Sequence, residues 1–180
     1  MTILVVGGAG YVGSHLVKQL HKDDGIIVYD SLENGHLESI PKDIKLIKGN
    51  LNDSKKLNET LKKYKIKTVM HFASYIEVGE SVRNPLKYYQ NNLINSVNLL
   101  NCMIKNNVKK IVFSSSAAVY GIPNKIPITE SESSKPINPY GYCKSIFENI
   151  LKDYNKSYGL NFISLRYFNA AGADPSGEIG

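Results

Sequence analysis

A glycine-rich turn near the N-terminus joins a short apolar strand to an amphipathic helix, and it constrains the fold more than any other feature. The apolar run at residues 3–6 is typical of a buried parallel strand, and the apolar positions of residues 11–20 recur with helical spacing. Strand, tight turn and helix N-terminus in this order hold a dinucleotide pyrophosphate, because backbone N–H groups and the helix dipole favour an anion there. We expect Gly7 to permit the turn, Gly10 to let N–H groups reach the phosphates, and Gly13 to let helix and strand pack closely.

The second apolar strand ends in an acidic residue, Asp30. At this distance from the turn, a carboxylate accepts hydrogen bonds from the hydroxyls of the adenosine ribose and repels a 2′-phosphate. No Lys or Arg lies between Ser31 and Leu37 to bind such a phosphate. The sequence therefore predicts NAD as the cofactor rather than NADP.

Length and composition exclude several classes of protein. The 180 residues are enough for one domain, which we expect to span residues 1–180. No apolar run approaches the roughly 20 residues that cross a bilayer, so we expect neither a membrane span nor a signal peptide. The net charge of +6 is spread over lysine-rich helix faces, which argues against a nucleic-acid partner. Cys102 and Cys143 lack metal-ligand spacing, so we expect reduced thiols, no metal and a cytoplasmic location, and we expect His71 to be packed rather than catalytic.

Apolar runs of strand length alternate with segments of helical periodicity along the chain. Asn84-Pro85 and Asn138-Pro139 each indicate a helix start, with Asn as the N-cap and Pro at the first helical position. The pattern predicts an α/β fold, a doubly wound parallel sheet of the Rossmann type with both faces covered. A long polar loop at residues 121–138 is a candidate functional segment. The predicted strands are residues 2–6, 26–30, 44–48, 68–73, 110–115 and 162–167, and the predicted helices are residues 11–22, 53–64, 85–105 and 139–158.

A serine, a tyrosine and a lysine form a second candidate site. Tyr140 and Lys144 are four residues apart at the start of a predicted helix, so they share one face, and Ser116 lies at the carboxyl end of an apolar strand. A phenol with a pKa near 10 is a poor base at neutral pH, but a nearby ammonium, helped by a positive nicotinamide, lowers that pKa. We expect Tyr140 to exchange a proton with a sugar or alcohol hydroxyl during hydride transfer, while Ser116 hydrogen-bonds the same oxygen.

Motifs spread over the whole chain carry a resemblance to a known family. They are Gly-Gly-Ala-Gly-Tyr-Val-Gly-Ser-His at 7–15, His-Phe-Ala at 71–73, Val-Gly-Glu-Ser-Val at 78–82, Pro-Leu-Lys-Tyr-Tyr-Gln-Asn-Asn at 85–92, Phe-Ser-Ser-Ser-Ala-Ala-Val-Tyr-Gly at 113–121, Pro-Tyr-Gly-Tyr-Cys-Lys at 139–144 and Leu-Arg-Tyr-Phe-Asn at 165–169. The chain resembles the extended short-chain dehydrogenase/reductases, and within them the UDP-glucose (UDP-galactose) 4-epimerases. The resemblance implies interconversion of these two UDP-sugars in galactose metabolism, through oxidation at C4, rotation of the 4-keto sugar and re-reduction.

The resemblance also assigns roles to individual positions. Ser116, Tyr140 and Lys144 match the catalytic residues, and Ser116, Tyr140 and Asn169 match positions that contact the UDP-sugar. Two helices that match residues 85–105 and 139–158 pair across a dimer in this family, which implies a homodimer. The positions that match cofactor contacts are Gly7, Gly10, Tyr11, Val12, Gly13, Asp30, Ser31, Asn34, Asn50, Leu51, Phe72, Ala73, Asn91, Ser114, Tyr140, Lys144 and Phe168.

Three departures from the family pattern bear on function. Asn50 stands where these enzymes usually carry an adenine-binding Asp, and an amide can still form a hydrogen bond there. Ile76 replaces a Lys that some members place beside the cofactor ribose. Ala117 and Ala118 stand where the related 4,6-dehydratases carry the Asp-Glu pair that eliminates water, so the sequence favours an epimerase.

Members of the family continue well beyond the length of this chain, with a smaller domain that binds uridine diphosphate. We therefore expect the chain to represent the NAD-binding part, with the C-terminal substrate domain absent. A 4-epimerase acting on a UDP-N-acetylhexosamine or a UDP-uronate would keep the same motifs. A non-catalytic NAD-binding module is a further alternative. A classical short-chain alcohol dehydrogenase is disfavoured, because the glycines of those enzymes follow the pattern Gly-x-x-x-Gly-x-Gly.

Overall fold

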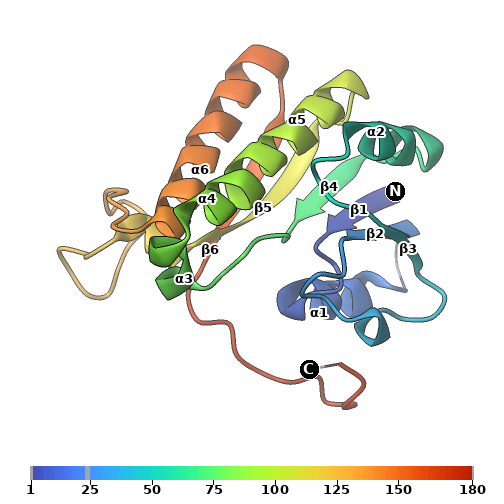
Figure 1. Cartoon of the computed structure of the whole chain (residues 1–180), viewed down its shortest axis with the longest axis horizontal. Coiled ribbons are helices and arrows are strands. Elements are labelled where there is room, and N and C mark those ends of the chain that lie inside the picture. The colour runs from blue at the N-terminus through green and yellow to red at the C-terminus, as the bar shows by residue number, and fades with distance from the viewer. Residues whose placement is uncertain (1, 23–24, 180) are drawn as a thin grey trace.

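The computed structural model describes residues 2–22 and 25–179, so the ends of the predicted domain, Met1 and Gly180, lie outside the described residues (Figure 1). The elements in chain order are β1 (Thr2–Val6), α1 (Tyr11–Leu20), β2 (Gly25–Asp30), the 3-10 turn η1 (Leu37–Ser39), β3 (Lys45–Lys48), α2 (Ser54–Lys63), β4 (Thr68–His71), α3 (Val78–Arg83), α4 (Pro85–Tyr88), the π-helix η2 (Tyr89–Ile94), α5 (Asn95–Lys105), β5 (Lys110–Ser116), the 3-10 turn η3 (Ala117–Tyr120), α6 (Pro139–Tyr158) and β6 (Asn161–Tyr167).

The strands form one parallel sheet in the order β3-β2-β1-β4-β5-β6, which confirms the predicted doubly wound fold. The strand order reverses direction between β1 and β4. In open sheets of this kind the ligand crevice lies outside the carboxyl ends of the strands at that reversal. The topology therefore places the candidate site beside the turn that follows β1.

Alternating side chains of the central strands build two cores. On one face, Leu4 and Val6 of β1 pack with apolar side chains of α2, α5 and α6, among them Leu57, Leu99 and Phe147. On the other face, Ile3 and Val5 of β1 and Ile26 and Val28 of β2 pack against Val17 of α1. Figure 1 shows α1 on the opposite side of the sheet from α2, α5 and α6.

The second helix layer is less complete than the sequence predicts. Within residues 2–22 and 25–179, α1 is the helix that covers this face, and it lies over β1 and β2. On β6, Ile163 is 58 % exposed and Leu165 is 39 % exposed. The apolar pattern of β6 therefore marks a face that the described part of the chain leaves open.

The predicted elements are present, with changes at their ends. The predicted strand 68–73 ends at His71, because the backbone of Phe72 and Ala73 turns toward the carbonyl oxygen of Val6. The predicted helix 85–105 is divided into α4, η2 and α5, and α3 precedes it without a sequence prediction. The two predicted N-caps are confirmed, since the side chains of Asn84 and Asn138 accept first-turn N–H groups.

Buried polar and sulfur groups follow the sequence predictions. Cys102 and Cys143 are buried free thiols. His71 is 1 % exposed, its Nε2 lies 2.8 Å from Ser96 Oγ, and burial lowers its pKa to about 3, so the imidazole is neutral. None of the helices in the described part of the chain combines the length and apolarity that a bilayer crossing needs.

Candidate functional site

The turn after β1 packs at backbone contact distance against the loop that follows β4. Gly7 has a φ of +80°, and a Cβ there would lie 2.4 Å from the backbone nitrogen of Ala73. A Cβ on Gly13 would lie 2.2 Å from the Gly7 carbonyl oxygen, so α1 packs against the turn at backbone contact distance. Both glycines thus have the structural roles that the sequence predicts.

Gly10 differs from these two, because the fold itself does not require a glycine there. Its φ is −83°, and the nearest atom to an added Cβ is the Gly7 carbonyl oxygen at 3.5 Å, an ordinary contact. Gly10 is also the N-cap of α1, and no side chain caps this helix. Open space beside uncapped helix N–H groups fits an anionic group at this position, as the pyrophosphate of a dinucleotide requires.

Asp30 ties the glycine-rich turn to the loop after β2. Its carboxylate accepts the Ala9 N–H at 2.9 Å and the Leu32 N–H at 2.8 Å, and the residue is 8 % exposed. Each carboxylate oxygen has a further lone pair, so hydrogen bonds to ribose hydroxyls remain possible. Asp30 therefore has a structural role in addition to the predicted binding role.

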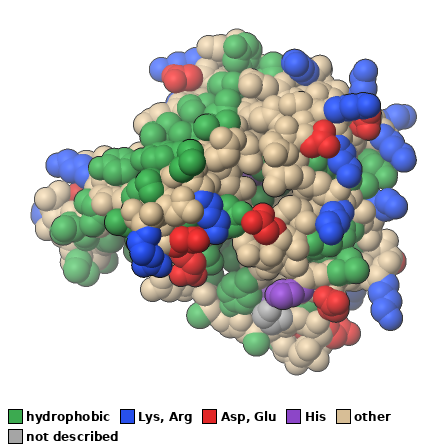
Figure 2. Space-filling view, viewed as in Figure 1, with side chains coloured by type: hydrophobic (Ala, Val, Ile, Leu, Met, Phe, Trp, Pro, Cys, Tyr) green, Lys and Arg blue, Asp and Glu red, His purple; other side chains and the backbone are tan. Residues whose placement is uncertain are grey.

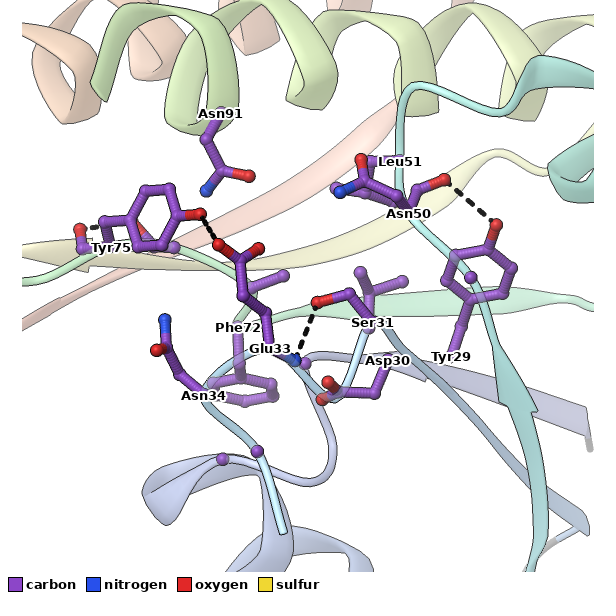
Figure 3. Close-up of a pocket in the computed structure, with 17 residues that line it drawn as sticks. Tyr29, Asp30, Ser31, Glu33, Asn34, Asn50, Leu51, Phe72, Tyr75 and Asn91 are labelled. Carbon is purple, nitrogen blue, oxygen red and sulfur yellow. Dashed lines mark hydrogen bonds between the residues drawn. The ribbon is translucent and has the colours of Figure 1, made fainter. Parts of the chain in front are cut away.

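A cavity at the carboxyl ends of β1, β2 and β4 brings most of the predicted cofactor residues together (Figure 3). At one end of the cavity, the Asn50 side-chain oxygen accepts the Asn52 N–H at 3.0 Å, while the backbone oxygen of Asn50 accepts the Tyr29 hydroxyl at 3.1 Å. The predicted residues that line the cavity are Gly7, Gly10, Asp30, Ser31, Asn34, Asn50, Leu51, Phe72, Ala73 and Asn91.

The sequence prediction missed further lining residues, which are Val6, Tyr29, Glu33, Gly35, Gly49, Ser74 and Tyr75. Glu33 and Tyr75 matter most, because their side chains meet through a hydrogen bond from the Tyr75 hydroxyl to a Glu33 carboxylate oxygen. Both lie in loops at the carboxyl ends of strands. The rule that ligands bind there was the available signal for them.

The other predicted cofactor residues lie outside this cavity. Tyr11, Val12 and Gly13 form the first turn of α1 beside it, and Ser114, Tyr140 and Lys144 lie on β5 and α6. Phe168 follows β6 and is 62 % exposed, and Asn169 next to it is also exposed. The Tyr11 hydroxyl donates to the Gly172 carbonyl oxygen at 2.5 Å, so the segment after β6 reaches α1.

The predicted catalytic residues meet where α6 packs on the end of β5. Lys144 is 4 % exposed, and its ammonium donates to the Ser114 carbonyl oxygen at 2.7 Å and lies 5.6 Å from the centre of the Tyr140 ring. Tyr140 is 9 % exposed, and its hydroxyl interacts with the Ser116 side chain. Spacing on the helix and the strand end therefore brings all three side chains together, as expected.

The acidity of this group differs from the sequence expectation. Burial raises the pKa of Tyr140, and the Ser116 hydrogen bond only partly offsets this effect. Burial also lowers the pKa of Lys144 to about 8. In the chain by itself the desolvation of the phenol therefore determines the direction of its pKa shift, opposite to the lowering that the sequence predicts from Lys144. The further lowering of the Tyr140 pKa by a positively charged nicotinamide stays a prediction.

A buried ion pair that sequence reasoning missed lies one helical turn from the predicted catalytic residue Lys144. Glu148, one turn after Lys144 on α6, is 5 % exposed and accepts two hydrogen bonds from Arg166 of β6, at 3.0 and 2.7 Å. It also accepts the Ser115 hydroxyl of β5 at 2.5 Å. One carboxylate therefore joins the helix of Tyr140 to both neighbouring strands.

Comparisons with known proteins agree with this geometry. Residues 3–179 match the NAD dependent epimerase/dehydratase family. The chain is 48 % identical over 181 aligned positions to UDP-glucose 4-epimerase from Lactobacillus helveticus, an alignment that covers 100 % of this chain and 55 % of the relative. It spans about half the length of the curated relatives that it matches.

Solved structures show the same architecture. UDP-glucose 4-epimerase from Brucella ovis in complex with NAD superimposes with a TM-score of 0.96 at 45 % identity, covering 99 % of this chain and 55 % of that one. UDP-N-acetylglucosamine 4-epimerase from Methanobrevibacter ruminantium, in complex with UDP-N-acetylmuramic acid, has a TM-score of 0.88 at 39 % identity, covering 95 % and 56 %.

Proposed function

The chain belongs to the NAD dependent epimerase/dehydratase family, and we propose that it forms the NAD-binding and catalytic part of a UDP-glucose 4-epimerase. The observation that carries this proposal is that two groups of residues lie together at the carboxyl edge of the sheet. The turn at Gly10 and the group of Ser116, Tyr140 and Lys144 lie along this one edge, with Tyr140 and Lys144 buried. This arrangement suits redox chemistry on a sugar hydroxyl.

The cavity residues would hold NAD along the edge. The first-turn N–H groups of α1 at Gly10 would bind the pyrophosphate, Asp30 the adenosine ribose and Asn50 the adenine. When bound, NAD would supply the hydride acceptor and donor for oxidation and re-reduction at C4 of the sugar. Every proton that accompanies this transfer is handled by the chain's own side chains.

Tyr140 is the group that we propose for proton transfer. Its hydroxyl, paired with Ser116, would accept the proton of the sugar 4-hydroxyl during oxidation and return it during reduction. Lys144, with a pKa of about 8, is largely protonated at neutral pH and would stabilise the phenolate when it forms. The low exposure of Tyr140 and Lys144 keeps water from competing for the proton.

The side chains next to Ser116 support an epimerase over a dehydratase. Elimination of water from the sugar requires an acid and a base beside the keto group. Ala117 and Ala118 occupy η3 directly after Ser116, and their methyl groups can supply neither function. Reversible oxidation at C4 requires no such pair, because Tyr140, Ser116, Lys144 and the cofactor would suffice.

A UDP-N-acetylhexosamine is a second candidate substrate. The similarity to the Methanobrevibacter ruminantium enzyme supports this alternative, because its fold matches over 95 % of this chain. Supplying UDP-galactose and UDP-N-acetylgalactosamine in equal amounts and comparing initial rates would decide between the two.

We also propose a homodimer in the cytoplasm. Large apolar side chains are exposed on the α4–α6 region, among them Leu86 at 76 %, Ile94 at 53 % and Ile146 at 39 %. Figure 2 shows hydrophobic side chains gathered over this side of the molecule. Pairing of two such surfaces would bury them. The free buried thiols of Cys102 and Cys143 are consistent with a reducing compartment.

The test measures NAD content and turnover on the same preparation. We expect the purified chain to release NAD on denaturation, and a protein that joins this chain to a substrate domain to convert UDP-galactose to UDP-glucose without added cofactor. Tyr140→Phe should retain its NAD and lose turnover by about 100-fold or more, because it lacks the proton-transferring hydroxyl. Turnover that survives this substitution would contradict the assigned role. NAD without any turnover in the wild-type chain by itself would leave the cofactor site in place and show that the chain needs the substrate domain for turnover.

A further inference from the structure

We propose that Glu33 and Tyr75 form a clasp across the cofactor cavity that slows the release of bound dinucleotide. The proposal rests on the proposed function only for the identity of the ligand. Neither residue belongs to the glycine-rich turn or to the group around Tyr140.

The two residues come from opposite sides of the cavity. Glu33 lies in the loop after β2, and Tyr75 lies in the loop after β4. Both line the cavity, and the Tyr75 hydroxyl donates a hydrogen bond to a Glu33 carboxylate oxygen (Figure 3). Residues 42 positions apart are thus joined between the two loops that flank the cavity. The loops cannot separate at this point unless the bond breaks.

The backbone of Tyr75 is fixed by a buried asparagine. Asn92, which is 4 % exposed, accepts the Tyr75 N–H and donates to the Tyr75 carbonyl oxygen, each at 2.9 Å. Asn92 belongs to the π-helix η2, as does Asn91, which lines the cavity. The position of Tyr75 is therefore set by a helix rather than by its own loop.

The ring of Tyr75 is also held on its outer side. The Lys87 ammonium lies 4.1 Å from the ring centre, and Lys87 is itself paired with Glu80 at 2.8 Å. The ring of Tyr88, which is fully buried, lies 5.8 Å away, centre to centre. These contacts orient the phenol toward Glu33 before any ligand binds, so the bond forms with little further loss of side-chain freedom.

Glu33, by contrast, is exposed and belongs to a loop that is anchored at Asp30. Asp30 connects this loop to the glycine-rich turn through the Ala9 N–H. The clasp therefore links a unit made of the turn and the β2 loop to the β4 loop held by η2. A dinucleotide on the turn at Gly10 lies between these two units, and its exit requires them to part.

The experiment follows the release of a fluorescent dinucleotide. The chain is loaded with NADH, mixed with excess NAD, and the loss of bound-NADH fluorescence is recorded for the wild type, Tyr75→Phe, Glu33→Ala and the double variant. Tyr75→Phe keeps the ring contacts with Lys87 and Tyr88 and removes only the hydroxyl. Tyr158→Phe is the matched control, since that tyrosine is half-exposed at the end of α6.

Each single variant should release NADH about fivefold faster than the wild type, the effect expected for loss of one partly exposed hydrogen bond. The double variant should release it no faster than either single variant, because both changes break the same bond. Glu33→Gln keeps an acceptor oxygen and should fall between the wild type and Glu33→Ala. Tyr158→Phe should match the wild type.

Two results would overturn the clasp. Release at the wild-type rate from Tyr75→Phe and Glu33→Ala would show that the bond does not retain the ligand. Multiplied effects in the double variant would show that the residues act independently. Failure of the wild type to bind either NADH or NAD is a distinct outcome, because it would refute the proposed cofactor site and the clasp with it.

Discussion

A Cβ atom on Gly13 would lie 2.2 Å from the Gly7 carbonyl oxygen, whereas one on Gly10 would meet no protein atom closer than 3.5 Å. Packing of the fold therefore requires a glycine at position 13, whereas the need for a glycine at position 10 comes from ligand binding. At Gly13 an added methyl group collides with the protein's own backbone. At Gly10 it enters the space that the cofactor phosphates would occupy.

We predict that Gly10→Ser leaves folding intact and removes cofactor binding. Serine is a favoured N-cap, so it should keep the free energy of unfolding within about 1 kcal/mol of the wild type. Its side chain would nevertheless fill the phosphate space and bond the helix N–H groups, weakening NAD binding by about tenfold or more. Calorimetric titration with NAD and urea unfolding check both parts. Gly13→Ala is the comparison, and it should destabilise the fold by about 1–3 kcal/mol or more.

Lys144, to which we assign a role in the proposed chemistry, carries a cost to stability. Its ammonium is buried, and desolvation lowers its pKa from 10.5 to about 8. We predict that Lys144→Met raises the free energy of unfolding at pH 7 by about 1–2 kcal/mol, because the buried charge costs more than its single bond to Ser114 returns. Turnover should be lost. A variant less stable than the wild type would contradict this account.

The lowered pKa of Lys144 also determines how this residue makes the free energy of unfolding depend on pH. Between pH 8 and 10.5 the folded chain binds fewer protons at Lys144 than the unfolded chain does, so this residue makes stability rise with pH over that range. Below pH 8 both states are protonated and the contribution is constant. The stability difference between Lys144→Met and the wild type should therefore shrink as the pH rises from 8 to 10, which urea unfolding at several pH values will show.

Residue-level predictions from sequence succeeded where a motif fixes the local geometry. The positions of Gly7 and Asp30 at the cavity follow from strands and a turn that are close in the sequence, whereas Asn50 was assigned to it through the family resemblance. Glu33 and Tyr75 were missed because their contact joins loops that only the folded sheet brings together. The acidity of Tyr140 was missed for a related reason, since desolvation depends on all the elements that pack around the ring.

At the level of elements, periodicity located the strands within two residues at each end. It could not predict that the helix expected at residues 85–105 contains the π-helix η2. A π-helix has wider spacing than an α-helix and occurs often at functional sites. Here Asn91 lines the cavity and Asn92 bonds the backbone of Tyr75, so both neighbouring side chains of η2 serve the site.

The buried ion pair between α6 and β6 lends itself to a double-mutant cycle. We predict that Arg166→Met destabilises the fold by about 3 kcal/mol, because it leaves the carboxylate of Glu148 buried beside Ser115 without a cation. Glu148→Gln together with Arg166→Met should cost less than the sum of the two single changes. Urea unfolding of the four proteins gives the coupling.

The exposed ion pair between Lys18 and Glu178 provides the control, since its N–O distance of 2.7 Å equals that between Arg166 and Glu148. Glu178→Gln should change stability little, because solvent screens that pair. Equal effects at the exposed and the buried pair would show that burial does not set the strength of the Glu148 contact.

For the whole molecule, the parallel fold follows from the alternation of strands and helices, whereas the coverage of the sheet does not. Apolar alternation indicates that a face is buried but not what buries it. Ile163 and Leu165 of β6 are apolar like the core strands, and yet they are exposed in the described chain. This chain spans about half the length of the curated relatives that it matches.

The exposed apolar side chains on α4–α6 lead to a separate prediction about the oligomeric state. Leu86 is 76 % exposed and Ile146 is 39 % exposed, and burying both against a second copy would remove apolar area from water without changing the cofactor cavity. We predict that the wild type sediments at equilibrium with the mass of two chains, and that Leu86→Glu with Ile146→Glu sediments with the mass of one, because a buried glutamate at each position opposes association.

Ile163→Glu is the matched control for this experiment, since Ile163 is 58 % exposed but lies on β6, away from the α4–α6 surface. It should leave the mass at two chains, and both proteins should retain NAD, because the cavity at Gly10 and Asp30 is formed within one chain. A wild type with the mass of one chain would contradict the dimer. A dimer that survives both glutamates but dissociates with Ile163→Glu would place the contact on the open face of the sheet instead.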